Sequence, residues 1–97
     1  MKPVIIHESA ELELRVAIDF YEAIRKRLGL DLEEEIRHAL AGIQDAPEVW
    51  PKKKHGTRYR LLTRFPFAIY YLDLPETIWI IAFAHTSRKP YYWRDRI

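Results

Sequence analysis

The feature that most constrains this chain is a pair of C-terminal segments that are apolar at nearly every position. Residues 77–85 read TIWIIAFAH, and residues 67–74 read FAIYYLDL. Alternate side chains of a strand point to opposite faces. Strands that are apolar at both sets of positions therefore need cover on both faces of their sheet. An uncovered face would leave an unusually large apolar patch, so the sequence predicts a sheet buried on both sides.

A third β segment, residues 57–64, precedes these two. The connections at 65–66 (Phe-Pro) and 75–76 (Pro-Glu) are tight, which favours a meander of antiparallel strands. Alternation predicts that one face of the first meander strand carries Arg58, Arg60, Leu62 and Arg64. The other face carries Tyr59 and Leu61.

Two amphipathic helices are predicted between a short first strand at residues 3–7 and the meander. Ser9 is the expected N-cap of the first helix and Gly29 its stop. The apolar face of the first helix is expected to contain Leu14, Ala17, Ile18, Tyr21, Ile24 and Leu28. Asp31 and Glu34 have the spacing of a capping box that would open the second helix. The buried stripe of that helix is expected to contain Leu32, Ile36, Ala39, Leu40 and Ile43.

The order of these elements defines the expected fold. Helices joined by about two residues form an antiparallel hairpin. The order β-α-α-β-β-β then predicts a single α+β domain, residues 1–97, with an antiparallel meander sheet packed on the helical hairpin. The hairpin can cover only one face of the sheet. The C-terminal tail or a bound partner must cover the other.

Charge divides the chain into two unlike halves. Residues 1–48 carry six Lys or Arg against eleven Asp or Glu, a net −5, whereas residues 49–97 carry ten against three, a net +7. Such an excess of cations attracts an anionic partner, either nucleic acid or an acidic peptide. The absence of cysteine excludes disulfides and fits a cytoplasmic protein. No apolar run reaches the roughly 20 residues of a membrane span, so no membrane association is expected.

The motifs of several enzyme classes are missing from the chain. The three glycines are isolated and form no phosphate-binding loop. The four histidines have no second ligand at a local metal spacing, so neither a metal nor a cofactor is expected. The serines lack a nucleophile-elbow context.

Cations alternate with aromatic residues directly after the last strand. Metal-independent RNA cleavage needs a base, a cation on the charged phosphorane and an acid. The candidates for these roles are His85, Arg88 and Tyr92, with Tyr91 as a second candidate for the acid. In a purely structural alternative, His85 is a strand-end imidazole bonded to backbone, and Tyr92 and Trp93 fold back over the sheet. Further candidates for binding a target or partner are Lys52, Lys54, Arg58, Arg60, Arg64, Trp93, Arg94 and Arg96.

Three strings, taken with the element order, resemble a known family. They are the G-x-R of Gly56–Arg58, FPFAIYY at 65–71 and IIAFAHTSRKPYYWRDR at 80–96. The chain resembles the RelE/ParE superfamily of type II toxin–antitoxin toxins, and most of all its plasmid-stabilisation branch. Members of that branch end in H-x-x-R-x-P-x-Y-W-x-x-R. The motif corresponds here to His85, Arg88, Pro90, Tyr92, Trp93 and Arg96.

The resemblance implies a partner and two alternative mechanisms. The partner is a cognate antitoxin that wraps the toxin and masks its basic, apolar groove. RelE-like members cleave mRNA in the ribosome, whereas ParE-like members poison DNA gyrase by protein contact. The RelE-like branch carries an arginine early in the middle meander strand, where this chain has Ala68. The resemblance therefore favours a ParE-like, non-enzymatic toxin. A RelE-like endoribonuclease and a degenerate toxin that only binds antitoxin stay open as alternatives.

Overall fold

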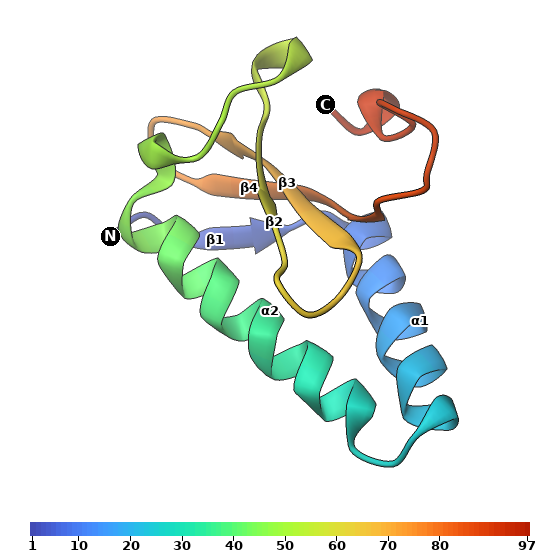
Figure 1. The fold of residues 1–97 in the computed structure, drawn as a ribbon. Coiled ribbons are helices and arrows are strands. Elements are labelled where there is room, and N and C mark those ends of the chain that lie inside the picture. Colours follow the sequence, from blue (N-terminus) through green and yellow to red (C-terminus); the bar gives the residue numbers. More distant parts are fainter.

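A computed structural model describes all 97 residues as one mixed sheet packed on a helical hairpin (Figure 1). Its helices and strands are β1 (Val4–Ile6), α1 (Glu8–Ile24), α2 (Leu28–Asp45), β2 (Arg58–Leu61), β3 (Phe67–Asp73) and β4 (Ile78–His85). Short 3₁₀ turns lie at Pro47–Val49, Lys54–Gly56 and Arg94–Arg96. The predicted α+β fold and the element order β-α-α-β-β-β are both confirmed.

The sheet has the strand order β1-β4-β3-β2. Strands β2, β3 and β4 form the expected antiparallel meander. In contrast, β1 pairs in parallel with β4, with Val4 opposite Ile78 and Ile6 opposite Ile80. The sheet is therefore mixed rather than purely antiparallel. The hairpin separates β1 from the meander, and a long connection of this kind permits parallel pairing.

The first helix starts earlier than expected because its cap is a histidine. His7, rather than Ser9, is the N-cap of α1, and its Nδ1 accepts a hydrogen bond from the Ser9 backbone N–H at 3.0 Å. The helix ends at Ile24, so the cations that follow form the turn of the hairpin instead of the last helical turn.

The second helix also begins before its predicted cap. It starts at Leu28 rather than at Asp31, directly after Arg27, whose φ of 75° places it in the left-handed region. The Glu22 carboxylate of α1 accepts the backbone N–H groups of Arg27 at 2.9 Å and Gly29 at 3.0 Å. These hydrogen bonds lower the pKa of Glu22. A carboxylate from the preceding helix therefore replaces the predicted capping box.

Gly29 is buried inside α2 instead of stopping α1. A Cβ atom at this position would lie 2.5 Å from the carbonyl oxygen of Ile18. The glycine thus allows the two helices to approach each other closely at the turn.

The main core lies between the hairpin and one face of the sheet. The buried residues that α2 contributes include four of the five predicted ones, namely Leu32, Ile36, Ala39 and Ile43, with Leu40 packed at the edge of the core. Two predictions for the first helix are wrong. Ile24 is 61% exposed and lies outside this core, and Leu28 packs on the core as the first residue of α2.

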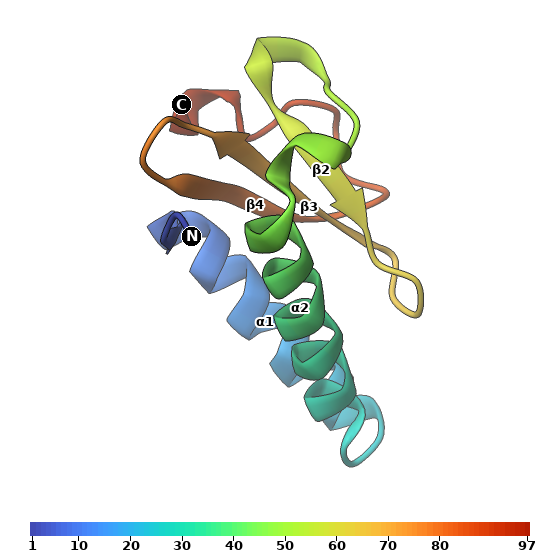
Figure 2. The ribbon, with the colours of Figure 1, turned by 90° about the vertical axis from the view of Figure 1, so that its left-hand side faces the viewer.

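The C-terminal tail covers part of the second sheet face. In Figures 1 and 2 the last segment of the chain lies on the side of the sheet opposite the helices. Trp93 is only 1% exposed and packs with Ile81, Ala82 and Ala84 of β4. An irregularity in the β3–β4 register leaves Ile81 without a partner, between the pairs Tyr71–Ile80 and Tyr70–Ala82. The chain therefore supplies much of the cover that the sequence required.

Candidate functional site: a cationic and aromatic cleft

A cleft of about 550 Å³ lies between the tail and the open face of β2 and β3. We call it the tail cleft. Its lining consists of Lys53, Tyr59, Leu61, Ala68, Tyr70, Ala84, His85, Thr86, Arg88, Lys89, Pro90, Tyr91, Tyr92 and Trp93. Ala68 adds little bulk at the position where the sequence analysis noted that the RelE-like branch carries an arginine. The lining contains three cations and no carboxylate, so the cleft is suited to an anionic or aromatic ligand.

Aromatic rings from the sheet and from the tail pack against one another in the cleft. Tyr59 of β2 lies opposite Tyr70 of β3, and their rings stack with centroids 5.7 Å apart. The Tyr70 ring lies 4.9 Å from that of Trp93, and Tyr91 lies 5.6 Å from Trp93. Burial raises the pKa of Tyr70, so its phenol stays neutral at ordinary pH. Such rings can stack on bases or hold aromatic side chains of a partner.

Three cations near these rings lie over a ring face. The Lys53 Nζ is 4.8 Å from the Tyr59 centroid and the Lys54 Nζ is 5.5 Å from the Tyr91 centroid. The Arg88 guanidinium lies closer, 3.8 Å from the centroid of Tyr92. Cation–π attraction holds these charges beside the cleft while leaving them exposed to a ligand.

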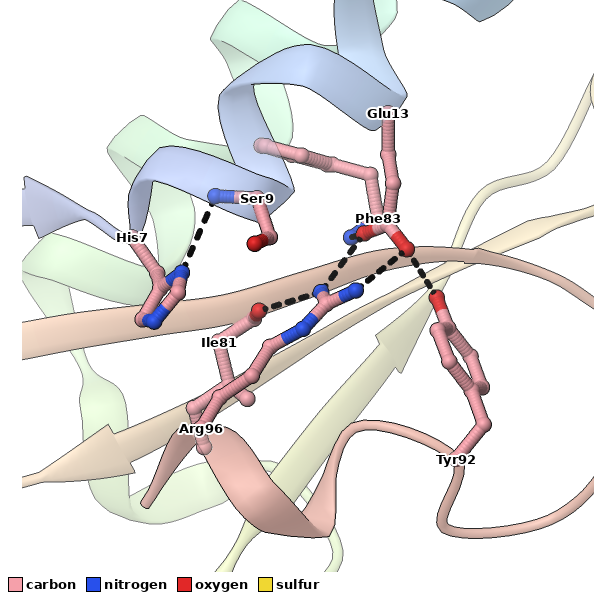
Figure 3. Close-up of polar contacts among 7 residues, drawn as sticks. All are labelled: His7, Ser9, Glu13, Ile81, Phe83, Tyr92 and Arg96. Atoms are coloured by element: carbon pink, nitrogen blue, oxygen red, sulfur yellow. Dashed lines mark hydrogen bonds and ion pairs between the residues drawn. The ribbon is translucent and has the colours of Figure 1, made fainter.

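Glu13 of α1 fixes the tail against β4, as Figure 3 shows. Its carboxylate accepts hydrogen bonds from the Tyr92 hydroxyl at 2.5 Å and from the Arg96 guanidinium at 2.9 and 3.0 Å. It also accepts the backbone N–H of Phe83 at 3.1 Å. Arg96 donates in addition to the carbonyl of Ile81 at 3.0 Å. We call Glu13, Tyr92 and Arg96 the tail latch.

The latch exists because β1 is short. Pairing between β1 and β4 ends at Ile80, which leaves the outer edge of β4 with unpaired backbone groups. Buried backbone groups need hydrogen-bond partners. Glu13 satisfies the N–H of Phe83, and Arg96 satisfies the carbonyl of Ile81. The side chains of Glu13 and Arg96 are only 15% and 17% exposed, so solvent screens their ion pair weakly.

The latch also determines what Tyr92 can do. Burial and the hydrogen bond to Glu13 raise the pKa of the Tyr92 phenol. Its hydroxyl points to Glu13 in Figure 3, while its ring contacts Arg88 on the side of the cleft. The hydrogen bond to Glu13 likewise raises the pKa of Arg96. Tyr92 therefore positions Arg88 through its ring and has its hydroxyl occupied elsewhere.

The imidazole of His85 is bonded to its own turn. Its Nδ1 accepts the Ser87 backbone N–H at 3.0 Å and lies 2.8 Å from the Ser87 hydroxyl. This is the strand-end arrangement set out above as the structural alternative. The fold does bring His85, Arg88 and Tyr92 into one cleft.

The arginines of β2 lie away from the tail cleft. Arg58 donates to the carbonyl of Trp50 at 2.7 Å, and Arg60 donates to the carbonyl of Ala39 in α2 at 3.1 Å. Arg64 is exposed and pairs with Asp31 of α2 at 3.4 Å. The predicted alternation holds for Arg58 and Arg60, but it turns them towards α2 and the loop after it. Arg64 lies beyond the strand, because β2 ends at Leu61 rather than at the predicted residue 64. The fold does not gather them with Arg88.

The remaining predicted binding residues either have a structural role or are exposed to solvent. Trp93 is a core residue and Arg96 belongs to the latch, whereas Lys52 and Arg94 are exposed. The sequence analysis did not select Lys53, Tyr59, Tyr70 or Glu13 as site residues. Tyr59 could have been found from the alternation of β2, which placed it opposite the arginines. Glu13 could have been found as an acid beside the apolar positions Ala10 and Ala17.

Comparison with known proteins supports the fold. Neither a protein-family model nor a curated protein matches the sequence. Among solved structures, the fold is similar to a chain from an entity described as "Chromosomal ParDE TA system from P. aeruginosa". The TM-score is 0.77 at 19% sequence identity, over 88% of this chain and 96% of that one. No helix has the length and apolarity that crossing a bilayer requires.

Proposed function

We propose that this protein is the toxin of a type II toxin–antitoxin system and acts by binding its target. The C-terminal motif supports this, as does the likeness in fold to a chain of a ParDE system over most of both chains. The tail cleft supplies a binding surface of fitting chemistry. Its exposed Arg88, stacked rings and lack of acids suit an acidic segment with aromatic or apolar side chains.

The hydrogen bonds of the His85 Nδ1 and of the Tyr92 hydroxyl favour binding over RNA cleavage. A nuclease needs a base and an acid aimed at the substrate. Here the Nδ1 of His85 bonds to Ser87, and the hydroxyl of Tyr92 bonds to Glu13. Arg88 is left as the exposed charged group of the three. A ParE-like toxin that binds DNA gyrase fits this arrangement.

The cognate antitoxin is proposed to bind over the tail cleft on the basic face of the sheet. An acidic segment of the antitoxin would pair with Arg88 and Lys53 and place an apolar side chain between the tyrosines. Residues 49–97, with their net charge of +7, would attract it. Occupation of the cleft by the antitoxin would then exclude the target.

Expression in a host without the antitoxin tests the proposal. We expect induction to arrest growth, and Arg88→Glu to relieve the arrest. Arg37→Glu is the matched control, because Arg37 is an exposed arginine of α2 outside the cleft. It should arrest growth like the unaltered protein. Continued growth despite abundant folded protein would contradict a toxin and would instead indicate a degenerate copy that only binds antitoxin.

A RelE-like nuclease is the second candidate, favoured by the presence of His85, Arg88 and Tyr92 in one cleft. The substitution Tyr92→Phe separates it from the binding toxin. A nuclease that uses the phenol as an acid would lose most of its activity, on the order of 10²-fold or more. A binding toxin would keep most of its activity, because the ring under Arg88 is retained and Arg96 still fixes the tail to Glu13.

A further inference from the structure

A row of exposed apolar side chains runs along α1. Leu12, Val16, Phe20 and Ile24 are 62%, 61%, 60% and 61% exposed, and they follow one another at intervals of four residues. We call them the α1 stripe. Single exposed apolar residues are ordinary, but four in one row form a patch of the kind that marks an interface. None of the four lines the tail cleft, although the groove beside them shares His85 and Arg88 with that cleft.

The α1 stripe borders a groove of about 310 Å³. Val16 and Phe20 belong to its lining, which continues towards the sheet through Phe67 and Phe83. The α1 stripe therefore forms a ridge along one side of the groove. A second helix could place its own ridge in such a hollow.

Charge is distributed unevenly along the same helix. Its first turn carries the exposed acids Glu8 and Glu11, and the turn after its end carries the exposed cations Arg25, Lys26 and Arg27. Glu22, near the same end, already caps α2. A copy of this helix running in the opposite direction would present its cations to these acids and its acids to these cations. The surface is thus complementary to itself.

We propose that the α1 stripe binds a second copy of this chain in an antiparallel, two-fold symmetric pair. The symmetry axis passes between Val16 and Phe20, level with position 18 along the helix. It places Val16 opposite Phe20 of the partner subunit and Leu12 opposite Ile24 of the partner subunit. Ridges formed by residues four apart interlock when the helices cross at about −50°. A two-fold axis uses the same patch on both copies, as a closed dimer requires.

The size of the patch determines how tightly the copies associate. Four half-exposed side chains on each subunit form an interface at the small end of the specific range, near 1,000 Å² in total. We therefore expect a reversible dimer. The mass measured by sedimentation should rise from 11.7 kDa towards twice that value as protein concentration increases.

Cysteine cross-linking tests the pair directly, because the chain has no cysteine of its own. Leu12→Cys and Ile24→Cys proteins carrying different tags are mixed and oxidised. Antiparallel pairing predicts disulfide dimers that join the two tags. Leu12→Cys alone should form few, because the two copies of position 12 lie about 18 Å apart along the helix axes. Efficient self-linking of Leu12→Cys would overturn the antiparallel arrangement.

Two glutamate substitutions complete the test. Phe20→Glu should weaken dimerisation at least tenfold while the circular dichroism spectrum stays unchanged. Val49→Glu is the matched control, because Val49 is 62% exposed but lies outside α1; it should leave dimerisation intact. A monomer at every concentration, or a stripe that becomes protected only in the presence of another protein, would overturn the proposal.

Discussion

The Glu13 side chain is bonded to three residues that lie far from it in the sequence. One carboxylate joins α1, the outer edge of β4 and the tail, through four hydrogen bonds to Phe83, Tyr92 and Arg96. The position of Arg88 depends on this group, because Arg88 lies on the Tyr92 ring that Glu13 holds. A residue outside the cleft thus determines the geometry inside it.

Loss of the Glu13 carboxylate should therefore be costly. Glu13→Ala leaves Arg96 largely buried without its counter-ion, and breaking such a pair costs about 3 kcal/mol of the free energy of unfolding. Urea denaturation measures this. Glu8→Ala, which removes an exposed acid from the same helix, should change stability by less than about 0.5 kcal/mol. Equal effects of the two substitutions would rule out the latch.

The raised pKa of Tyr71 predicts that the free energy of unfolding falls at alkaline pH. Its buried hydroxyl donates to the carbonyl of Pro47 at 2.6 Å, and burial raises its pKa from 10.0 to about 12. The folded state holds this proton more tightly than the unfolded state. The stabilisation is therefore complete below pH 10 and is lost as the pH rises towards 12, by about 2 kcal/mol.

Urea denaturation of Tyr71→Phe and of the unaltered protein at several pH values tests this prediction, because it measures the free energy of unfolding of each. The variant should lose less stability between pH 10 and 12, because it lacks the Tyr71 phenol, although Tyr70 and Tyr92 still titrate. Tyr59→Phe serves as the control for removal of a phenol at the surface of the cleft. A variant whose stability falls as steeply as that of the unaltered protein would show that Tyr71 is not responsible.

At the scale of elements, strands were predictable and helix ends were not. Alternation identified β2, and continuous apolar runs identified β3 and β4, because each face of a strand depends on its own sequence. The starts of α1 and α2 depend on the His7 imidazole and the Glu22 carboxylate. Neither residue belongs to the usual capping types, so the local pattern pointed to Ser9 and Asp31 instead.

The candidate site was predictable only in part, for a related reason. The sequence identified His85, Arg88 and Tyr92 by their types and spacing. It did not show that Arg58 and Arg60 face the helices, because this depends on which face of β2 the hairpin covers. Nor did it indicate Glu13, whose partners lie about 70 or more residues away in the chain.

The hairpin itself offers a test at this scale. Gly29→Ala would place a Cβ atom 2.5 Å from the carbonyl oxygen of Ile18, and backbone cannot move aside as a flexible side chain can. We expect a loss of about 1–3 kcal/mol, despite the higher helix propensity of alanine. Thermal unfolding measures it. An Ala41→Gly variant at an exposed position of α2 gives the cost of the propensity change alone, about 1 kcal/mol. Stabilisation by Gly29→Ala would show that the helices do not approach so closely.

At the scale of the whole molecule, the two sides of the sheet are covered in different ways. The hairpin covers one side and encloses the main core there. The tail covers the β4 half of the other and leaves the tail cleft over β2 and β3. The sequence required cover on both sides without deciding between tail and partner. The structure shows the tail in this role, and the cleft beside it is the place proposed for a partner.

The most direct test of a binding toxin is a supercoiling reaction with purified DNA gyrase and no ribosomes. The proposed function predicts that the protein inhibits supercoiling and traps cleaved DNA, and that Arg88→Glu loses at least tenfold in potency while Arg37→Glu does not. Unchanged supercoiling, together with cutting of ribosome-bound mRNA in a parallel reaction, would contradict it.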